Sequence, residues 1–339
     1  MEPSGPTLPS PLGVGGVGGA GGSVILDVRD LSVEFRSEEG WLRAVDGVGF
    51  TVRQGEIVGL VGESGAGKSL TSEAILGLIR CPPGRIRGQV HFRGRDLLGL
   101  PEPALARIRG KDVAMIFQNP SASLNPVFRV GDQVLEAMTL HLAEPRRTLR
   151  ERVVDILTRV GIPSAAARAR DYPHQFSGGM AQRVMIGMGM ACVPSLLIAD
   201  EPTTALDVTI QAQVLALIRR LARETRVAVL LVSHDLGIIS QMCDRVLVMY
   251  AGRIVEEAPI ATIFGNPAHP YTRGLMACLP RVEGTERLEV IPGVMPGLAG
   301  IPPGCPFHPR CPLAEPRCAE EAPKLRPVGA THHAACHLA

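Results

Sequence analysis

Gly62-Glu63-Ser64-Gly65-Ala66-Gly67-Lys68-Ser69 follows the pattern G-x-x-x-x-G-K-[ST], which is typical of a phosphate-binding loop. The largely apolar residues 56–61 before it predict a short buried strand, and residues 70–79 after it predict a helix. A strand, a glycine-rich loop and a helix N-terminus in this order direct backbone N–H groups at a polyphosphate. We therefore predict that the chain binds a nucleotide through this loop.

The residues of this loop have distinct expected parts. Glycine leaves room for a phosphate to approach the backbone and adopts backbone angles that other residues avoid. The Lys68 ammonium would reach the β- and γ-phosphates, and the Ser69 hydroxyl would bind Mg²⁺. The predicted nucleotide-binding residues here are Gly62, Ser64, Gly65, Gly67, Lys68, Ser69 and Leu70.

The composition of the 339 residues argues against several classes of protein. A net charge of only +2 gives no electrostatic argument for a nucleic-acid partner. The N-terminus lacks the basic start and the apolar run of a secretory signal. The uncharged residues 184–199 contain Pro194 and run into Asp200, which favours a buried helix and strand over a membrane span. We expect a cytosolic protein whose cysteines stay reduced.

Predicted strands and helices alternate along the chain. Residues 1–23, rich in glycine and proline, predict a disordered tail. Residues 24–35 and 45–52 predict strands ahead of the loop. Residues 119–180 predict a helical insertion, because apolar side chains between 149 and 160 recur at three- and four-residue steps. This alternation predicts an α/β fold built on a mainly parallel sheet.

Polar side chains follow three further predicted strands. Asp200 and Glu201 come at the end of one apolar run, and His234 follows the next. Gln118 comes directly after residues 113–117. Because the carboxyl ends of parallel strands lie at one edge of a sheet, we expect these side chains near the phosphate-binding loop.

Five elements therefore occur in a fixed order: the loop, Gln118, Ser177-Gly178-Gly179, Asp200-Glu201 and His234. This set resembles the ATP-binding-cassette ATPases over residues 24–264. The resemblance implies a P-loop ATPase core of the RecA-like kind, with an antiparallel β subdomain and a helical subdomain at about 119–180. Residues 265–339 would then form an irregular C-terminal extension.

The resemblance implies a hydrolytic site that uses ATP and Mg²⁺. Asp200 would hold the metal together with Ser69, and Gln118 would touch the metal or the water. Glu201 would polarise the water that attacks the γ-phosphate, because the end of a strand holds it within hydrogen-bond reach. His234 would contact the γ-phosphate.

The resemblance also implies a second, similar subunit. Ser177-Gly178-Gly179 comes before a predicted helix and would form another anion-binding helix N-terminus. In this family that element closes on ATP held by the opposite subunit, and Asp207 would cross the same interface. An aromatic residue ahead of the loop would stack on adenine, and both Phe35 and Trp41 qualify by position, although either could equally be an ordinary hairpin residue.

Four further segments are similar to the ATPases of dipeptide and oligopeptide importers: residues 61–65, 117–126, 172–180 and 266–273. That similarity implies a second ATPase, two membrane permease subunits and an extracytoplasmic binding protein as partners, at the cytoplasmic face of the membrane. Nickel importers and importers of other small solutes share the pattern. A soluble, non-transport ATPase of this family is a further alternative, but the chain lacks the second cassette, long coiled coil or basic surface usual there.

Four cysteines gather in a proline- and glycine-rich C-terminal region: Cys305, Cys311, Cys318 and Cys336. Such a region needs more than a hydrophobic core to order it, and a metal can supply this. Structural zinc usually uses closer cysteine pairs, and disulfides are rare in the cytosol. A [4Fe–4S] cluster takes four thiolates and tolerates varied loops. Zinc and unmetallated thiols remain alternatives, while the resemblance to peptide-importer ATPases implies the cluster.

Overall fold

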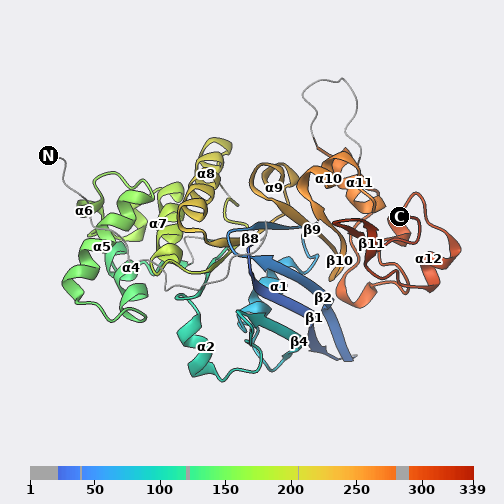
Figure 1. The fold of residues 1–339 in the computed structure, drawn as a ribbon, viewed down its shortest axis with the longest axis horizontal. Coiled ribbons are helices and arrows are strands. Elements are labelled where there is room, and N and C mark those ends of the chain that lie inside the picture. Colours follow the sequence, from blue (N-terminus) through green and yellow to red (C-terminus); the bar gives the residue numbers. More distant parts are fainter. Residues whose placement is uncertain (1–21, 39, 120–122, 205, 280–289) are drawn as a thin grey trace.

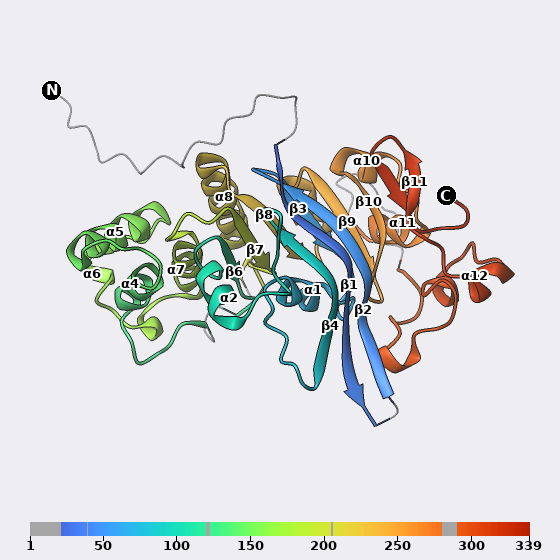
Figure 2. The same cartoon turned by 60° about the horizontal axis from the view of Figure 1, so that its bottom comes forward.

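The computed structural model describes residues 22–38, 40–119, 123–204, 206–279 and 290–339. Almost all of the predicted tail, residues 1–23, thus lies outside the described residues. Two sheets form the body of the molecule, with a group of helices at one end and the C-terminal residues at the other (Figure 1). Figure 2 shows the same arrangement after a turn of 60°.

The larger sheet consists of β3 (Ile57–Val61), β6 (Val113–Ile116), β7 (Leu196–Asp200), β8 (Ala228–Ser233), β9 (Arg245–Tyr250), β10 (Arg253–Pro259), β11 (Arg326–Gly329) and β12 (His332–Ala334). Its strand order is β11-β12-β10-β9-β3-β8-β7-β6. β3 pairs in parallel with β8 and β9, and β7 pairs in parallel with β6 and β8. The predicted mainly parallel sheet is confirmed.

The smaller sheet is antiparallel and consists of β1 (Val24–Ser37), β2 (Gly40–Arg53), β4 (Gly84–Phe92) and β5 (Arg95–Asp96). Side chains of β3 alternate between two hydrophobic clusters, as the pleat of a strand requires. Val58 and Leu60 pack with α1 (Lys68–Ile75) and the smaller sheet. Ile57 and Val61 pack on the opposite face. The two faces of β3 therefore join both sheets into one body.

Helices cover that opposite face and form the group at one end. They are α4 (Val130–Thr139), α5 (Arg146–Arg159), α6 (Ala165–Arg168), α7 (Gly178–Met190), α8 (Val208–Thr225) and α9 (Leu236–Met242), while α2 (Glu102–Ile108) lies beside the smaller sheet (Figure 1). Val153 and Leu157 of α5 are buried, as the predicted apolar spacing requires. Among the helices that the structure describes, none is both long and apolar enough to cross a membrane.

The C-terminal extension is more regular than expected. α10 (Ile260–Gly265) leads into it, and it contains α11 (Pro270–Ala277), α12 (Pro316–Glu320) and two short strands that continue the larger sheet. β12 pairs antiparallel with β10, with Glu256 opposite Ala334. A strand of three residues, two of them histidine, offers no apolar alternation, which is why the sequence did not indicate it.

A buried carboxylate fastens the extension to the sheet. Glu256 of β10 is 0% exposed. It accepts hydrogen bonds from the N–H groups of Ala268 and His269 at 2.6 and 3.0 Å, and His332 Nε2 lies 2.7 Å from its Oε1. One side chain therefore joins β10, the segment before α11 and β12.

Replacing this carboxylate is expected to destabilise the whole chain. Glu256→Ala leaves the N–H groups of Ala268 and His269 and the His332 ring without their acceptor, so the free energy of unfolding falls by about 3–5 kcal/mol. Urea unfolding of the purified protein measures this loss. Glu315→Ala serves as the control, because Glu315 forms an exposed pair with Arg317 and its loss costs less than about 1 kcal/mol. Equal effects of the two substitutions would contradict the role of Glu256.

Candidate active site

The predicted phosphate-binding loop lies between β3 and the N-terminus of α1. Gly67 is the N-cap of α1 with φ of 102°, in the left-handed region that glycine favours. A Cβ atom on Gly62 would lie 2.2 Å from the carbonyl oxygen of Met249 in β9. Neither position accepts another residue without moving the backbone, so the glycines fix the shape of the loop.

Lys68 is folded back onto this loop. Its Nζ donates hydrogen bonds to the carbonyl oxygens of Gly62 and Glu63 at 2.9 and 3.0 Å. Burial lowers the pKa of Lys68, and the carboxylates of Glu201 and Asp200 oppose that shift. A charged phosphate offers the ammonium a stronger partner than these carbonyls. The geometry therefore suits the predicted contact with phosphate.

Ser69 and Asp200, both predicted to bind Mg²⁺, are brought together. Ser69 Oγ donates a hydrogen bond to Asp200 Oδ1 at 3.1 Å. Burial raises the pKa of Asp200, and the hydrogen bond from Ser69 works against it. Mg²⁺ prefers oxygen ligands and commonly binds one or two side chains together with substrate phosphates and water. The pair fits this ion, with the remaining ligands to come from a nucleotide and solvent.

Glu201 is surrounded by polar partners. Gln118 Nε2 and Thr204 Oγ1 donate hydrogen bonds to its Oε2 at 2.8 and 2.9 Å, and His234 Nδ1 lies 3.1 Å from its Oε1. Burial tends to raise the pKa of Glu201, but the hydrogen bonds from His234 and Thr204 outweigh it and hold the pKa below its usual value. The carboxylate is thus ionised at neutral pH, as a group that polarises water must be.

The backbone at Glu201 is unusual, with φ of 45°. This left-handed conformation is uncommon for residues other than glycine, and residues in such strained conformations are enriched at active sites. Of the three partners of Glu201, the sequence indicated Gln118 and His234. Thr204 was missed, because a threonine three residues after an acidic pair is an ordinary turn residue without its spatial context.

Ser177-Gly178-Gly179 and Asp207 lie at the adjoining N-termini of α7 and α8. Ser177 Oγ and Asp207 Oδ1 cap these helices, accepting hydrogen bonds from Met180 N at 3.3 Å and Ile210 N at 3.0 Å. A Cβ on Gly179 would lie 2.7 Å from a methyl group of Ile210, so the helix ends pack closely. Within the described ranges, neither Ser177 nor Asp207 hydrogen-bonds to residues 62–69.

The two candidate adenine-stacking residues differ in their surroundings. Phe35 is partly buried and packs against the hydrophobic cluster between the two sheets. Trp41 is exposed, and the guanidinium of Arg85 lies 3.9 Å from the centroid of its ring. One face of Trp41 is thus already occupied by a cation.

The four C-terminal cysteines line one cavity, together with His269 and Phe307 among others. All four are free thiols, and burial raises the pKa values of Cys305 and Cys311. In the described part of the chain, no three His, Cys, Asp or Glu side chains are grouped so that they could hold a metal ion. The predicted [4Fe–4S] cluster therefore stays a prediction.

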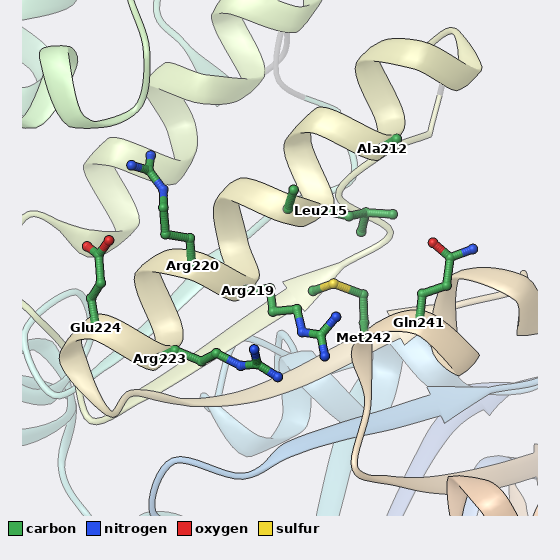
Figure 3. A pocket seen from close by; sticks show the side chains of 9 residues that line it. Ala212, Leu215, Arg219, Arg220, Arg223, Glu224, Gln241 and Met242 are labelled. Atoms are coloured by element: carbon green, nitrogen blue, oxygen red, sulfur yellow. The ribbon is translucent and has the colours of Figure 1, made fainter.

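A separate pocket of about 450 Å³ lies between α8 and α9 (Figure 3). Arg219 and Arg223 of α8 and Met242 of α9 line it. None of the predicted site residues contributes to this pocket, so the chemistry described above belongs to the edge formed by β3, β7 and β8.

Two family models match the chain. The model described as "ABC transporter" matches residues 45–204, and the one described as "Oligopeptide/dipeptide transporter, C-terminal region" matches residues 255–318.

Among solved structures, the ATP-binding cassette MJ0796, dimeric and bound to ADP and Pi, has a TM-score of 0.62. It is 24% identical and covers 69% of this chain and 98% of its own. The cbiO1 protein of Clostridium perfringens has a TM-score of 0.61 at 24% identity, covering 72% of this chain and 91% of its own. These likenesses concern the fold.

Relatives with curated names are similar over nearly their whole length. The dipeptide transport ATP-binding protein DppD of Escherichia coli is 47% identical over 92% of this chain and 96% of its own. The oligopeptide transport ATP-binding protein OppD of Salmonella typhimurium is 48% identical over 93% of each chain. This chain is therefore an ATPase and belongs to the ATP-binding proteins of the dipeptide and oligopeptide ABC transporters.

Proposed function

We propose that this ATPase powers the import of dipeptides or oligopeptides through separate permease subunits. The observation that carries the proposal is similarity across both parts of the chain, since the relatives named for peptide transport match the nucleotide-binding residues and the C-terminal extension alike. Nickel or another small solute is the competing cargo.

The proposed assembly places the chain at the cytoplasmic face of a membrane, with a second ATPase, two permease subunits and an extracytoplasmic binding protein. Support for the second ATPase comes from the N-termini of α7 and α8. Ser177, Gly178 and Asp207 are exposed there. Such paired helix ends bind anions. In the assembly they meet the ATP that the partner's loop holds.

Within this site each residue has one proposed task. The glycines of the loop, with Lys68 and Leu70, hold the phosphates, and Ser69 and Asp200 hold Mg²⁺, which supplies charge neutralisation of the phosphates.

Glu201 orients and polarises the water, and its hydrogen bond from Gln118 links this carboxylate to the segment that leads into the helical insertion. His234 contacts the γ-phosphate, and Phe35 stacks on adenine.

Peptide import is tested with the full assembly in vesicles. ATP is supplied on the side of the ATPase, and uptake of a labelled dipeptide, a labelled tetrapeptide and Ni²⁺ is compared. Peptide uptake that requires ATP and the binding protein is the expected result. Ni²⁺ uptake without peptide uptake would replace the proposed cargo, and ATP hydrolysis that no permease alters would overturn the transport role.

Glu201→Gln is expected to separate binding from hydrolysis. The amide keeps the shape of the side chain but cannot accept a proton, so the rate of hydrolysis falls roughly 100-fold or more, while MgATP still binds. Phosphate release and nucleotide binding by the purified protein measure the two effects. Glu151→Gln on α5 is a matched control, because that carboxylate is exposed on the helical group. Hydrolysis by Glu201→Gln at near the control's rate would refute the assignment.

We propose, further, that the four C-terminal cysteines hold the [4Fe–4S] cluster, with support from their convergence on one cavity. Four free thiols are the donor set that such a cluster takes, and the varied loops between these cysteines are compatible with it. When bound, the cluster would order the extension and supply one-electron chemistry.

Metal content of protein purified without oxygen tests this assignment. We expect about four irons and about four sulfides per chain, with the corresponding visible absorption. Cys311→Ser should lower the iron content, whereas the control Cys81→Ser should not, because Cys81 is exposed and lies in the loop after α1. Zinc in place of iron, or no metal at all, would overturn the cluster.

A further inference from the structure

The C-terminal extension touches the phosphate-binding loop directly, at Glu63. Arg310 Nη1 lies 3.0 Å from Glu63 Oε1 and 3.1 Å from Oε2. The hydroxyl of Tyr271 in α11 accepts a hydrogen bond from the N–H of Glu63 at 3.0 Å. Lys68 Nζ binds the carbonyl oxygen of the same residue at 3.0 Å. The side chain, N–H and carbonyl of Glu63 are thus all held, the first two by the extension.

The extension makes a second contact with the loop at Gly65, two residues after Glu63. A Cβ atom on Gly65 would be 2.9 Å from Cε of Met295, so this methionine of the extension covers the loop at a glycine with φ of 81°. The extension therefore meets the loop at two of its eight positions.

Arg310 is held in place by several partners besides Glu63. Its side chain is only 7% exposed. Nε donates to the carbonyl oxygen of Pro292 at 2.8 Å, and Nη1 lies 3.4 Å from the hydroxyl of Tyr250. The guanidinium also lies 6.0 Å from the ring centroid of Phe307. A planar cation held by this many partners loses little freedom when it pairs with a carboxylate.

The charge of Glu63 matters because of where it stands. Its carboxylate belongs to the loop that is proposed to receive a polyphosphate, and like charges repel each other. An unpaired Glu63 would therefore repel the phosphates that the loop is proposed to bind.

We propose that Arg310 is a positioning residue for nucleotide binding, which cancels the charge of Glu63 and holds the loop in its phosphate-binding conformation. The residue comes from the extension, 247 positions along the chain from Glu63. A segment outside the ATPase core thereby sets the affinity of the core for ATP. The inference rests on the phosphate role proposed for residues 62–69.

The test is a double-mutant cycle on the purified full-length chain, with the Kd for MgATP as the readout. Arg310→Gln leaves the Glu63 carboxylate unpaired and should raise the Kd roughly tenfold. In Glu63→Gln the charge is absent, so adding Arg310→Gln to it should change the Kd less than about threefold. Arg310→Lys restores the charge without the planar fork and should recover part of the affinity.

Controls separate this role from a merely structural one. Arg317→Gln removes an exposed arginine of the same extension, whose partner is Glu315, and should leave the Kd unchanged. Thermal unfolding reports any loss of fold in each variant. A Kd that is unaffected by Arg310→Gln, or single effects that simply add in the double variant, would overturn the proposal. Failure of the unsubstituted chain to bind MgATP, or binding unaffected by Lys68→Ala, would instead refute the role of the loop.

Discussion

The structure depends on the parallel pairing of β3, β8 and β7. Val61 lies opposite Ser233 and Asp200 lies opposite Val232, so the three strands end at the same level. The loop after β3, the acid after β7 and the histidine after β8 are consequently delivered to one edge of the sheet. The helical group and the C-terminal extension attach at the two ends of this sheet and leave the edge in place (Figure 1).

The electrostatics of this edge are prepared for an incoming anion. Burial lowers the pKa of Lys68, and three carboxylates, those of Glu201, Asp200 and Glu63, oppose that shift. Burial also disfavours the charge of Glu201, but hydrogen bonds from neighbouring residues keep the pKa of Glu201 below its usual value. Neighbouring groups thus favour the charged forms of both Lys68 and Glu201. The side-chain partners of Glu201 are already in place, as in a preorganised site, whereas Lys68 and Ser69 would exchange their present partners for phosphate and Mg²⁺.

Much of this site was predictable from the sequence, because its parts are local. A glycine-rich loop ending in Lys68 needs only neighbouring residues to define its chemistry, and Asp200 and His234 are marked by the apolar runs before them. The pair of Arg310 and Glu63 was not predictable. The local sequence does not show whether an arginine in a turn pairs with a distant carboxylate or faces solvent. β12 was missed for a similar reason, because its pairing with β10 rather than its own composition makes it a strand.

The roles proposed for Ser177 and Asp207 depend on a second subunit, whereas the role proposed for the four cysteines depends on how distant parts of this chain meet. Ser177 and Asp207 cap their own helices here, and the sequence assigned them to another subunit's nucleotide only through resemblance. The four cysteines converge on one cavity, although they lie in a region whose short helices and turns carry no periodic pattern. The positions of the four cysteines in the sequence do not reveal that they lie around one cavity, and only the three-dimensional structure shows it.

The pairing of β12 with β10 also has a consequence for how the protein is made. During synthesis, β10 leaves the ribosome well before residues 332–334, and until then it is an edge strand with unpaired N–H and C=O groups on one side. The carboxylate of Glu256 likewise has no His332 to pair with until that residue has been synthesised. The nascent core therefore passes through a stage with an open sheet edge, the kind of surface on which incomplete chains associate wrongly. Completion of the extension closes this edge, so the extension serves the assembly of the sheet as well as its finished form.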